Sequence, residues 1–199
     1  MKPVSAFYKV CYCLARFFLG IFYWLDVTGR EKIPEGAAII CANHSSMADP
    51  FLIAFVCGIN SNLHIISKAE LFRIPVLSAV LTKLGMISVD RDTIDVKTIK
   101  KTFNYLKNGE KVAIFPEGTR SSEDDAITAK IGAVKIAEHT RADVVPAFIP
   151  RKKSIFRKVR VVIGDPYRIE KQEVKRVHDD YVELTKQLMG KIKALDPGR

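Results

Sequence analysis

Short apolar runs alternate with longer segments of helical periodicity along most of this chain. The runs are bounded by Gly, Pro, Asn and Asp, a pattern typical of buried strands. Strands are expected at 37–42, 63–67, 86–89, 111–115, 143–149 and 159–164. Helical patterns cover 50–58, 75–85, 93–108, 130–139 and 169–195. This alternation predicts an α/β fold in which a mixed, mainly parallel sheet is flanked by helices on both faces.

Residues 1–28 have a different pattern, dense in aromatic and aliphatic side chains. Lys2, Lys9 and Arg16 recur every seven residues and so share one stripe of a helix. A spanning helix needs about 20 mostly apolar residues, and Arg16 interrupts that length. We therefore expect 1–28 to be an amphipathic helical segment that lies in a membrane interface, divided at Gly20. A spanning helix and ordinary core packing are the alternatives, and 29–199 forms the remaining domain.

The net charge indicates which binding partners suit the chain, and the cysteine spacing indicates its redox compartment. The 199 residues carry a formal net charge of +10, which suits nucleic acid, anionic lipid or a phosphorylated substrate. The basic residues are dispersed and no nucleic-acid-binding motif occurs, so a nucleic-acid partner is not expected. Cysteines 11, 13, 41 and 57 fit no disulfide or zinc spacing, which indicates a reduced, cytosol-facing protein.

The strand 37–42 runs into a polar turn that carries His44 and Asp49. In open α/β sheets the carboxyl edge of the strands is where ligands bind. If the chain were helical here, the five-residue spacing would place His44 and Asp49 on different faces of the helix. They therefore meet only if the chain turns between them. Pro50 favours the first position of a helix, so Asp49 is expected to cap that helix with one oxygen and reach His44 with the other.

A carboxylate on one ring nitrogen leaves the other nitrogen of His44 free to accept a proton. No G-x-S-x-G nucleophile motif occurs, so this base would act on a hydroxyl of the substrate itself. The alternative is a histidine that only satisfies hydrogen bonds of the turn. A metal site is not expected, because no H-E-x-x-H spacing or Cys/His cluster accompanies the pair.

A second polar loop, 116–121, follows the strand 111–115. Gly118 allows close approach of the backbone, Thr119 and Ser121 offer hydroxyls, and Arg120 offers a fork for phosphate or carboxylate. Together with Glu117, these residues predict an oxyanion-binding site at the same edge of the sheet.

Three further residues lie in or just after strands. Lys68 and Arg91 each follow a strand end. Lys68 could line the pocket or simply lie on the surface, and Arg91 could be an anion ligand or a salt-bridged loop residue. His64 lies inside the strand 63–67, and we expect it to be structural.

Four blocks together resemble the glycerolipid acyltransferases. NHSSMADP resembles their H-x4-D block and FPEGTRS their E-G-T-R-S block, while ISVDRD and VVPAFIP resemble the second and fourth blocks. The match covers 29–164, and it is to bacterial 1-acyl-sn-glycerol-3-phosphate acyltransferases of the PlsC type. It implies a glycerol-3-phosphate acyltransferase-like fold and no metal or redox cofactor.

The resemblance implies transfer of a fatty acyl group from acyl-CoA or acyl carrier protein to the sn-2 hydroxyl of lysophosphatidic acid. The product would be phosphatidic acid, in phospholipid biosynthesis. The same chemistry on glycerol-3-phosphate or a lysophospholipid, and a non-enzymatic lipid-binding protein, are the alternatives. An anionic membrane surface and a place on the cytoplasmic face of the cell membrane, as a monotopic or peripheral protein, follow from the same resemblance.

The resemblance also assigns roles to residues. His44 would be the general base and Asp49 its partner, while Arg120 would meet the acceptor phosphate. Glu117 would fix its loop or contact the acceptor, and Arg91 matches a basic residue of the second block. The chain departs from the family pattern at 128–132, where Lys130 is the one lysine kept of a pair.

Overall fold

The structure is a computed structural model that describes residues 3–89, 96–118, 130–172 and 176–198. Within these ranges one sheet of seven strands has the order β1-β7-β6-β2-β5-β3-β4. The strands are β1 Tyr23–Thr28, β2 Ala38–Ala42, β3 Leu63–Lys68, β4 Ile87–Val89, β5 Lys111–Ile114, β6 Asp143–Phe148 and β7 Arg157–Ile163. The α-helices are α1 Ala6–Phe22, α2 Asp49–Cys57, α3 Pro75–Lys83, α4 Val96–Lys107, α5 Gly132–Thr140 and α6 His178–Ala194, with short 3-10 helices at Arg30–Lys32 and Ala69–Arg73.

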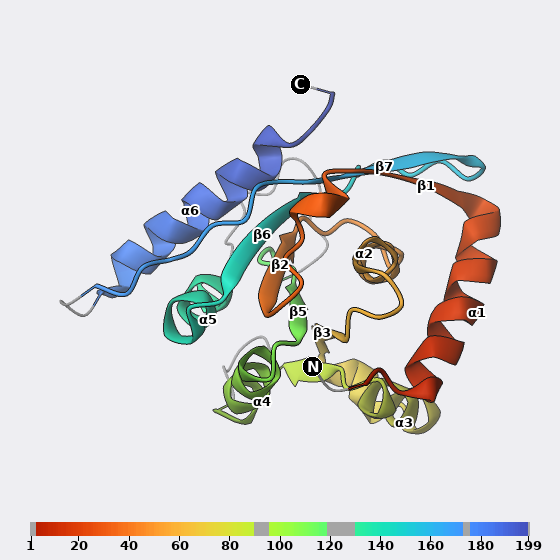
Figure 1. The fold of residues 1–199 in the computed structure, drawn as a ribbon, viewed down its shortest axis with the longest axis horizontal. Coiled ribbons are helices and arrows are strands. Elements are labelled where there is room, and N and C mark those ends of the chain that lie inside the picture. The colour runs from red at the N-terminus through yellow and green to blue at the C-terminus, as the bar shows by residue number, and fades with distance from the viewer. Residues whose placement is uncertain (1–2, 90–95, 119–129, 173–175, 199) are drawn as a thin grey trace.

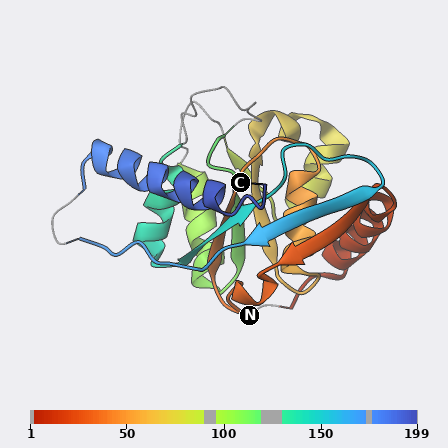
Figure 2. The same cartoon turned by 90° about the horizontal axis from the view of Figure 1, so that it is seen from above.

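The sheet is mixed and mainly parallel, as the alternation of strands and helices predicts. Strands β2 to β6 all run in one direction. β7 pairs antiparallel with the end of β6, and β1 pairs parallel with β7, so both run the opposite way. Figure 2 shows these two strands side by side at one edge of the molecule.

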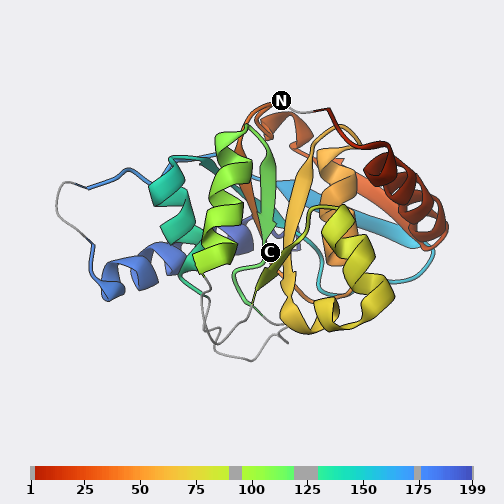
Figure 3. The same cartoon turned by 90° about the horizontal axis from the view of Figure 1, so that it is seen from below.

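Helices cover both faces of this sheet (Figures 1 and 3). α4, α5 and α6 lie on one face, and α2 lies on the other with α1 and α3 beside it. Successive residues of β2 point to opposite faces, so Ile39 packs with α5 and α6 whereas Ile40 packs with α2. Because both faces are covered, β2 is apolar at every position, and β5 is apolar after its first residue, Lys111.

The N-terminal segment differs from the sequence-based expectation in two respects. The helix α1 continues through Gly20, and it ends at Phe22 rather than near residue 28. A glycine costs a helix only about 1 kcal/mol, which is too little to break one. Residues 23–28 form β1, which pairs along its whole length with β7. Their odd-numbered side chains pack on the core, a two-residue period that the surrounding aromatic residues obscure.

The carboxyl ends of β2, β5 and β6 lie next to one another. Cys41 of β2 pairs with Ile114 of β5, and Ala42 pairs with Ala147 of β6. The segments that leave these strands therefore start from the same edge of the sheet. This register brings together residues that are separated by more than 100 positions in the sequence.

Candidate active site

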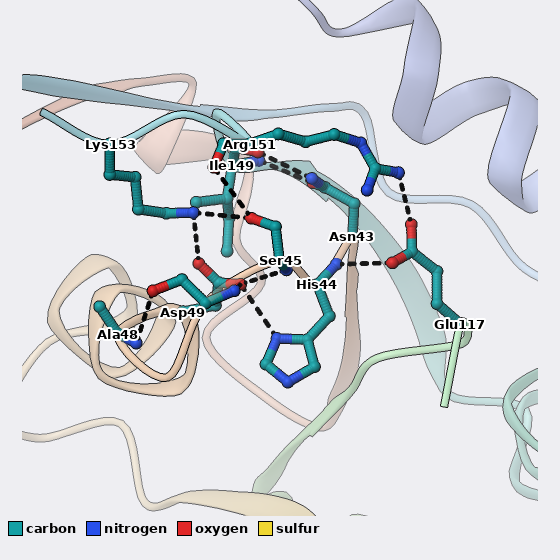
Figure 4. Close-up of polar contacts among 10 residues, drawn as sticks. Asn43, His44, Ser45, Ala48, Asp49, Glu117, Ile149, Arg151 and Lys153 are labelled. Carbon is teal, nitrogen blue, oxygen red and sulfur yellow. Dashed lines mark hydrogen bonds and ion pairs between the residues drawn. The ribbon is translucent and has the colours of Figure 1, made fainter. Parts of the chain in front are cut away.

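The turn after β2 brings His44 and Asp49 into contact (Figure 4). Nδ1 of His44 lies 2.9 Å from Oδ2 of Asp49. The same oxygen accepts hydrogen bonds from the backbone amides of Ser45, at 2.7 Å, and Ser46, at 2.8 Å. The carboxylate thus stabilises the turn through its backbone amides and orients the imidazole of His44.

The expectation that Asp49 also caps the following helix is wrong. Asp49 is the first residue of α2, with Pro50 behind it. Its side chain points back into the turn, where one carboxylate oxygen accepts hydrogen bonds from the backbone amides of Ser45 and Ser46. The other oxygen lies 2.8 Å from the ammonium of Lys153.

Asp49 is fully buried and charged. Burial alone would raise the pKa of its carboxyl, but hydrogen bonds from His44, Lys153 and the Ser45 amide outweigh that effect, and the pKa lies below its ordinary value. The carboxylate is therefore ionised at neutral pH. An ionised carboxylate only accepts hydrogen bonds, so Nδ1 of His44 must carry the proton of their shared bond.

The imidazole of His44 is oriented with its second nitrogen available. The ring stacks on Phe115, with ring centroids 4.4 Å apart and planes inclined by 28°. The side chain is 13% exposed, and among the residues that the structure describes no group bonds Nε2. In the neutral ring this nitrogen is a proton acceptor, so the geometry allows it to accept the proton of a substrate hydroxyl.

Glu117 supports His44 through the backbone. Its Oε2 accepts the His44 amide at 3.1 Å, and its Oε1 forms an ion pair with Arg151 at 3.0 Å. The Glu117 side chain is fully buried. Of the two roles that the sequence left open, contact with the acceptor or fixing of its own loop, these bonds favour the second, and they add a link to the segment after β6.

Asn43 completes the connection between β2 and β6. Its amide donates to the carbonyl of Ile149 at 2.7 Å and accepts from the amide of the same residue at 2.8 Å. The sequence identifies Asn43 only as a turn residue, and Arg151 and Lys153 only as part of a basic run suited to an acyl donor or a lipid surface. Asn43 directly follows β2, the signal that also identified His44 and Glu117, whereas Arg151 and Lys153 lie in the segment after β6, which ends at Phe148.

For the other predicted site residues, the structure gives no contact with His44. Arg91 and the triplet Thr119, Arg120 and Ser121 lie outside the described residues, so their assigned roles stay predictions. Lys68 ends β3, is 45% exposed at its side chain and pairs with Glu70 at 2.7 Å. Gly118 adopts a φ of +69°, and a Cβ there would meet Cγ of Lys130 at 3.3 Å.

His64 has a structural role, as expected. It is buried, and its Nε2 lies 2.5 Å from a carboxylate oxygen of Glu110. Its ring stacks on Tyr105, and its Nδ1 contacts the carbonyl of Gly85. These contacts join β3 to α4 and to the turn before β4.

The described site thus holds a histidine ring, oriented by an ionised carboxylate, at the carboxyl edge of an α/β sheet, where ligands bind in such folds. A family model described as Acyltransferase matches residues 25–150. The chain belongs to this acyltransferase family, and it is an acyltransferase.

Two curated relatives and one solved structure are similar to the chain. The 1-acyl-sn-glycerol-3-phosphate acyltransferase of Bacillus subtilis is 34% identical over 166 residues, which cover 80% of this chain and 81% of the relative. The protein of that name from Borreliella burgdorferi is 32% identical over 162 residues, 74% of this chain, and this chain spans 62% of its length. The crystal structure of the 1-acyl-sn-glycerophosphate acyltransferase PlsC from Thermotoga maritima superposes with a TM-score of 0.66 at 27% identity, covering 94% of this chain and 80% of that one.

Proposed function

We propose that this enzyme transfers a fatty acyl group from acyl-CoA or acyl carrier protein to the sn-2 hydroxyl of lysophosphatidic acid, forming phosphatidic acid. The observation that carries the proposal is the His44–Asp49 pair, whose outer nitrogen faces no group of the described chain. The choice of acceptor is supported by the names of the Bacillus and Borreliella relatives.

The geometry supports a direct transfer. Nε2 of His44 takes the proton of the acceptor hydroxyl as that oxygen attacks the thioester carbonyl. The carbon–sulfur bond then breaks, the ester forms, and the leaving thiolate takes the proton from the imidazolium. Asp49 stabilises the imidazolium while it exists. Each step needs only the two substrates and the chain, so we propose that no metal or redox cofactor takes part.

The acceptor is tested by a panel that separates the head group from the acyl chain. Lysophosphatidic acid, lysophosphatidylcholine and glycerol-3-phosphate are each supplied at equal concentration with palmitoyl-CoA, and with palmitoyl acyl carrier protein in parallel. We expect kcat/KM to be highest for lysophosphatidic acid. Equal or faster turnover of lysophosphatidylcholine would contradict the need for a terminal phosphate, and faster turnover of glycerol-3-phosphate would replace the acceptor.

An apolar ridge on the outside of the molecule supports a membrane location. It consists of Val10, Leu14, Phe17, Phe18, Ile21, Phe22, Ile155 and Phe156, each at least 42% exposed. The α1 members share one face of the helix, whereas Tyr12 on the opposite face packs edge-on against Phe55 of α2. Phe156 of the β6–β7 segment extends the ridge, because its amide donates to the carbonyl of Phe22 and the two rings lie 5.9 Å apart.

We propose that this ridge lies in the interface of an anionic membrane. In the described part of the chain, no helix is both long and apolar enough to cross a bilayer. A surface-lying helix with an exposed apolar face fits the interface instead. The net charge of +10 favours the anionic cytoplasmic leaflet.

Replacing Phe17 and Phe18 together by serine is expected to weaken vesicle binding by about tenfold or more, since the loss of each ring reduces the apolar area that the membrane buries. The measurement is co-sedimentation with phosphatidylglycerol-containing vesicles. Ile99→Ser is the matched control, because Ile99 is also exposed but lies on α4 across the sheet. Equal loss in both variants would show that the ridge is not the docking surface.

A further inference from the structure

A lysine side chain is buried behind the His44–Asp49 pair. Lys153 belongs to the segment that joins β6 to β7, and its side chain is only 3% exposed. Its ammonium lies 2.8 Å from Oδ1 of Asp49 and donates to the hydroxyl of Ser45 at 2.9 Å. The two oxygens of Asp49 are therefore divided between His44 and Lys153, as Figure 4 shows.

The burial of Lys153 is specific to this residue within a basic segment. Lys152 and residues 154–158 are all exposed. Lysine is almost never buried unless its charge is paired, and here the partner is the carboxylate that orients the proposed base. The contact is also tied into the turn, because the Ser45 hydroxyl donates in turn to the carbonyl of Arg151 at 3.3 Å.

The charges around His44 are balanced in pairs. Asp49 faces Lys153, and Glu117, which binds the His44 amide, faces Arg151. A buried carboxylate with no cation beside it would hold a proton on the neighbouring imidazole. An imidazolium cannot take a proton from a hydroxyl, so a variant that lacks the countercharge is expected to be a poorer base catalyst.

We propose that Lys153 is a positioning residue for acyl transfer, which fixes the 45–49 turn through Ser45 and offsets the charge of the Asp49 carboxylate that orients the His44 ring. The inference rests on the proposed role of His44 as the base. It assigns a function to a residue 109 positions away from His44 in the sequence.

The test follows the protonation of His44 directly, by an NMR titration of its ring in wild type, Lys153→Met and Lys152→Met. The chain has four histidines, and the His44→Ala spectrum assigns the signal. We expect the titration midpoint of His44 to lie higher in Lys153→Met than in wild type, because loss of the cation favours the protonated ring. Lys152→Met removes one charge from the same segment but should leave the midpoint at its wild-type value. An unchanged midpoint in Lys153→Met would overturn the proposal, whether or not the enzyme is active on any acceptor.

Kinetics supply the second measurement. The acid limb of the kcat/KM profile should move to higher pH in Lys153→Met, so that the loss of activity grows as the pH falls, and Lys153→Arg should restore the wild-type profile. If Lys153→Met does not fold, the substitution is placed in an Asp49→Asn background, where both buried charges are removed together. The double variant should be no less active than Asp49→Asn alone, and a further tenfold loss would overturn the proposal.

Discussion

His44→Ala is expected to lower kcat by a factor of at least about 10²–10⁴ while the protein stays folded, since this is the usual contribution of a general base. The substitution removes the one proton acceptor that the turn presents, but it leaves no buried charge unpaired. Asp49 keeps the Ser45 and Ser46 amides and Lys153. We therefore expect the free energy of unfolding, measured in urea, to change by only about 1 kcal/mol.

His139→Ala is the control for this variant. His139 is exposed on α5, and its ring contacts only the carbonyl of Lys135 among the described residues. It should keep wild-type turnover. Both variants are purified in the same way as wild type, so that contaminating activity is removed equally. A kcat of His44→Ala close to that of wild type would then contradict the assignment of His44 as the base.

Asp49→Ala is expected to damage both activity and stability. It leaves the ammonium of Lys153 buried without a countercharge and two turn amides without their acceptor. Breaking a buried pair on one side costs about 3–5 kcal/mol, so the free energy of unfolding should fall by that amount. Turnover should fall by about 10² or more, because the imidazole loses the group that orients it.

Asp49→Asn separates the two effects. The amide oxygen can still accept from the turn, so the loss of stability should be smaller than in Asp49→Ala, while turnover falls almost as far. Urea denaturation and kcat, measured on both variants, check this. If Asp49→Asn keeps wild-type turnover, the charge on Asp49 has no part in the reaction.

The depressed pKa of Asp49 sets a pH window for its stabilising effect. The folded carboxylate gives up its proton at a lower pH than the unfolded one. Its contribution is therefore complete above the ordinary aspartate pKa of about 4, and it is lost as the pH falls through the folded value. The stability gap between wild type and Asp49→Asn should accordingly shrink below about pH 4, and a gap that stays constant in acid would contradict this account.

Much of the fold and half of the described site follow from the sequence. The apolar runs place the central strands closely, since strands covered on both faces are mostly apolar, as β2 and β5 are. The five-residue spacing of His44 and Asp49 requires a turn, and the structure contains one. The strand 23–28 is the clear failure, because its alternation is hidden within an apolar aromatic stretch that continues from α1.

The support of the site from the β6–β7 segment could not be predicted. Arg151, Lys152 and Lys153 are consecutive basic residues, and nothing in their order tells which side chain turns inward. That choice depends on the register of β6 beside β2, which places Ala147 opposite Ala42, and on the Asn43–Ile149 hydrogen bonds. Such long-range geometry determines which lysine is buried, whereas local pattern marks all three only as basic.

The most direct test of the account is acyl transfer from palmitoyl-CoA to lysophosphatidic acid in mixed micelles, with wild type beside His44→Ala and free thiol as the readout. We expect steady thiol release and phosphatidic acid formation by wild type, and a rate lower by at least about 10²-fold in the variant. Equal thiol release by both proteins would contradict the central claim that His44 is the base for acyl transfer.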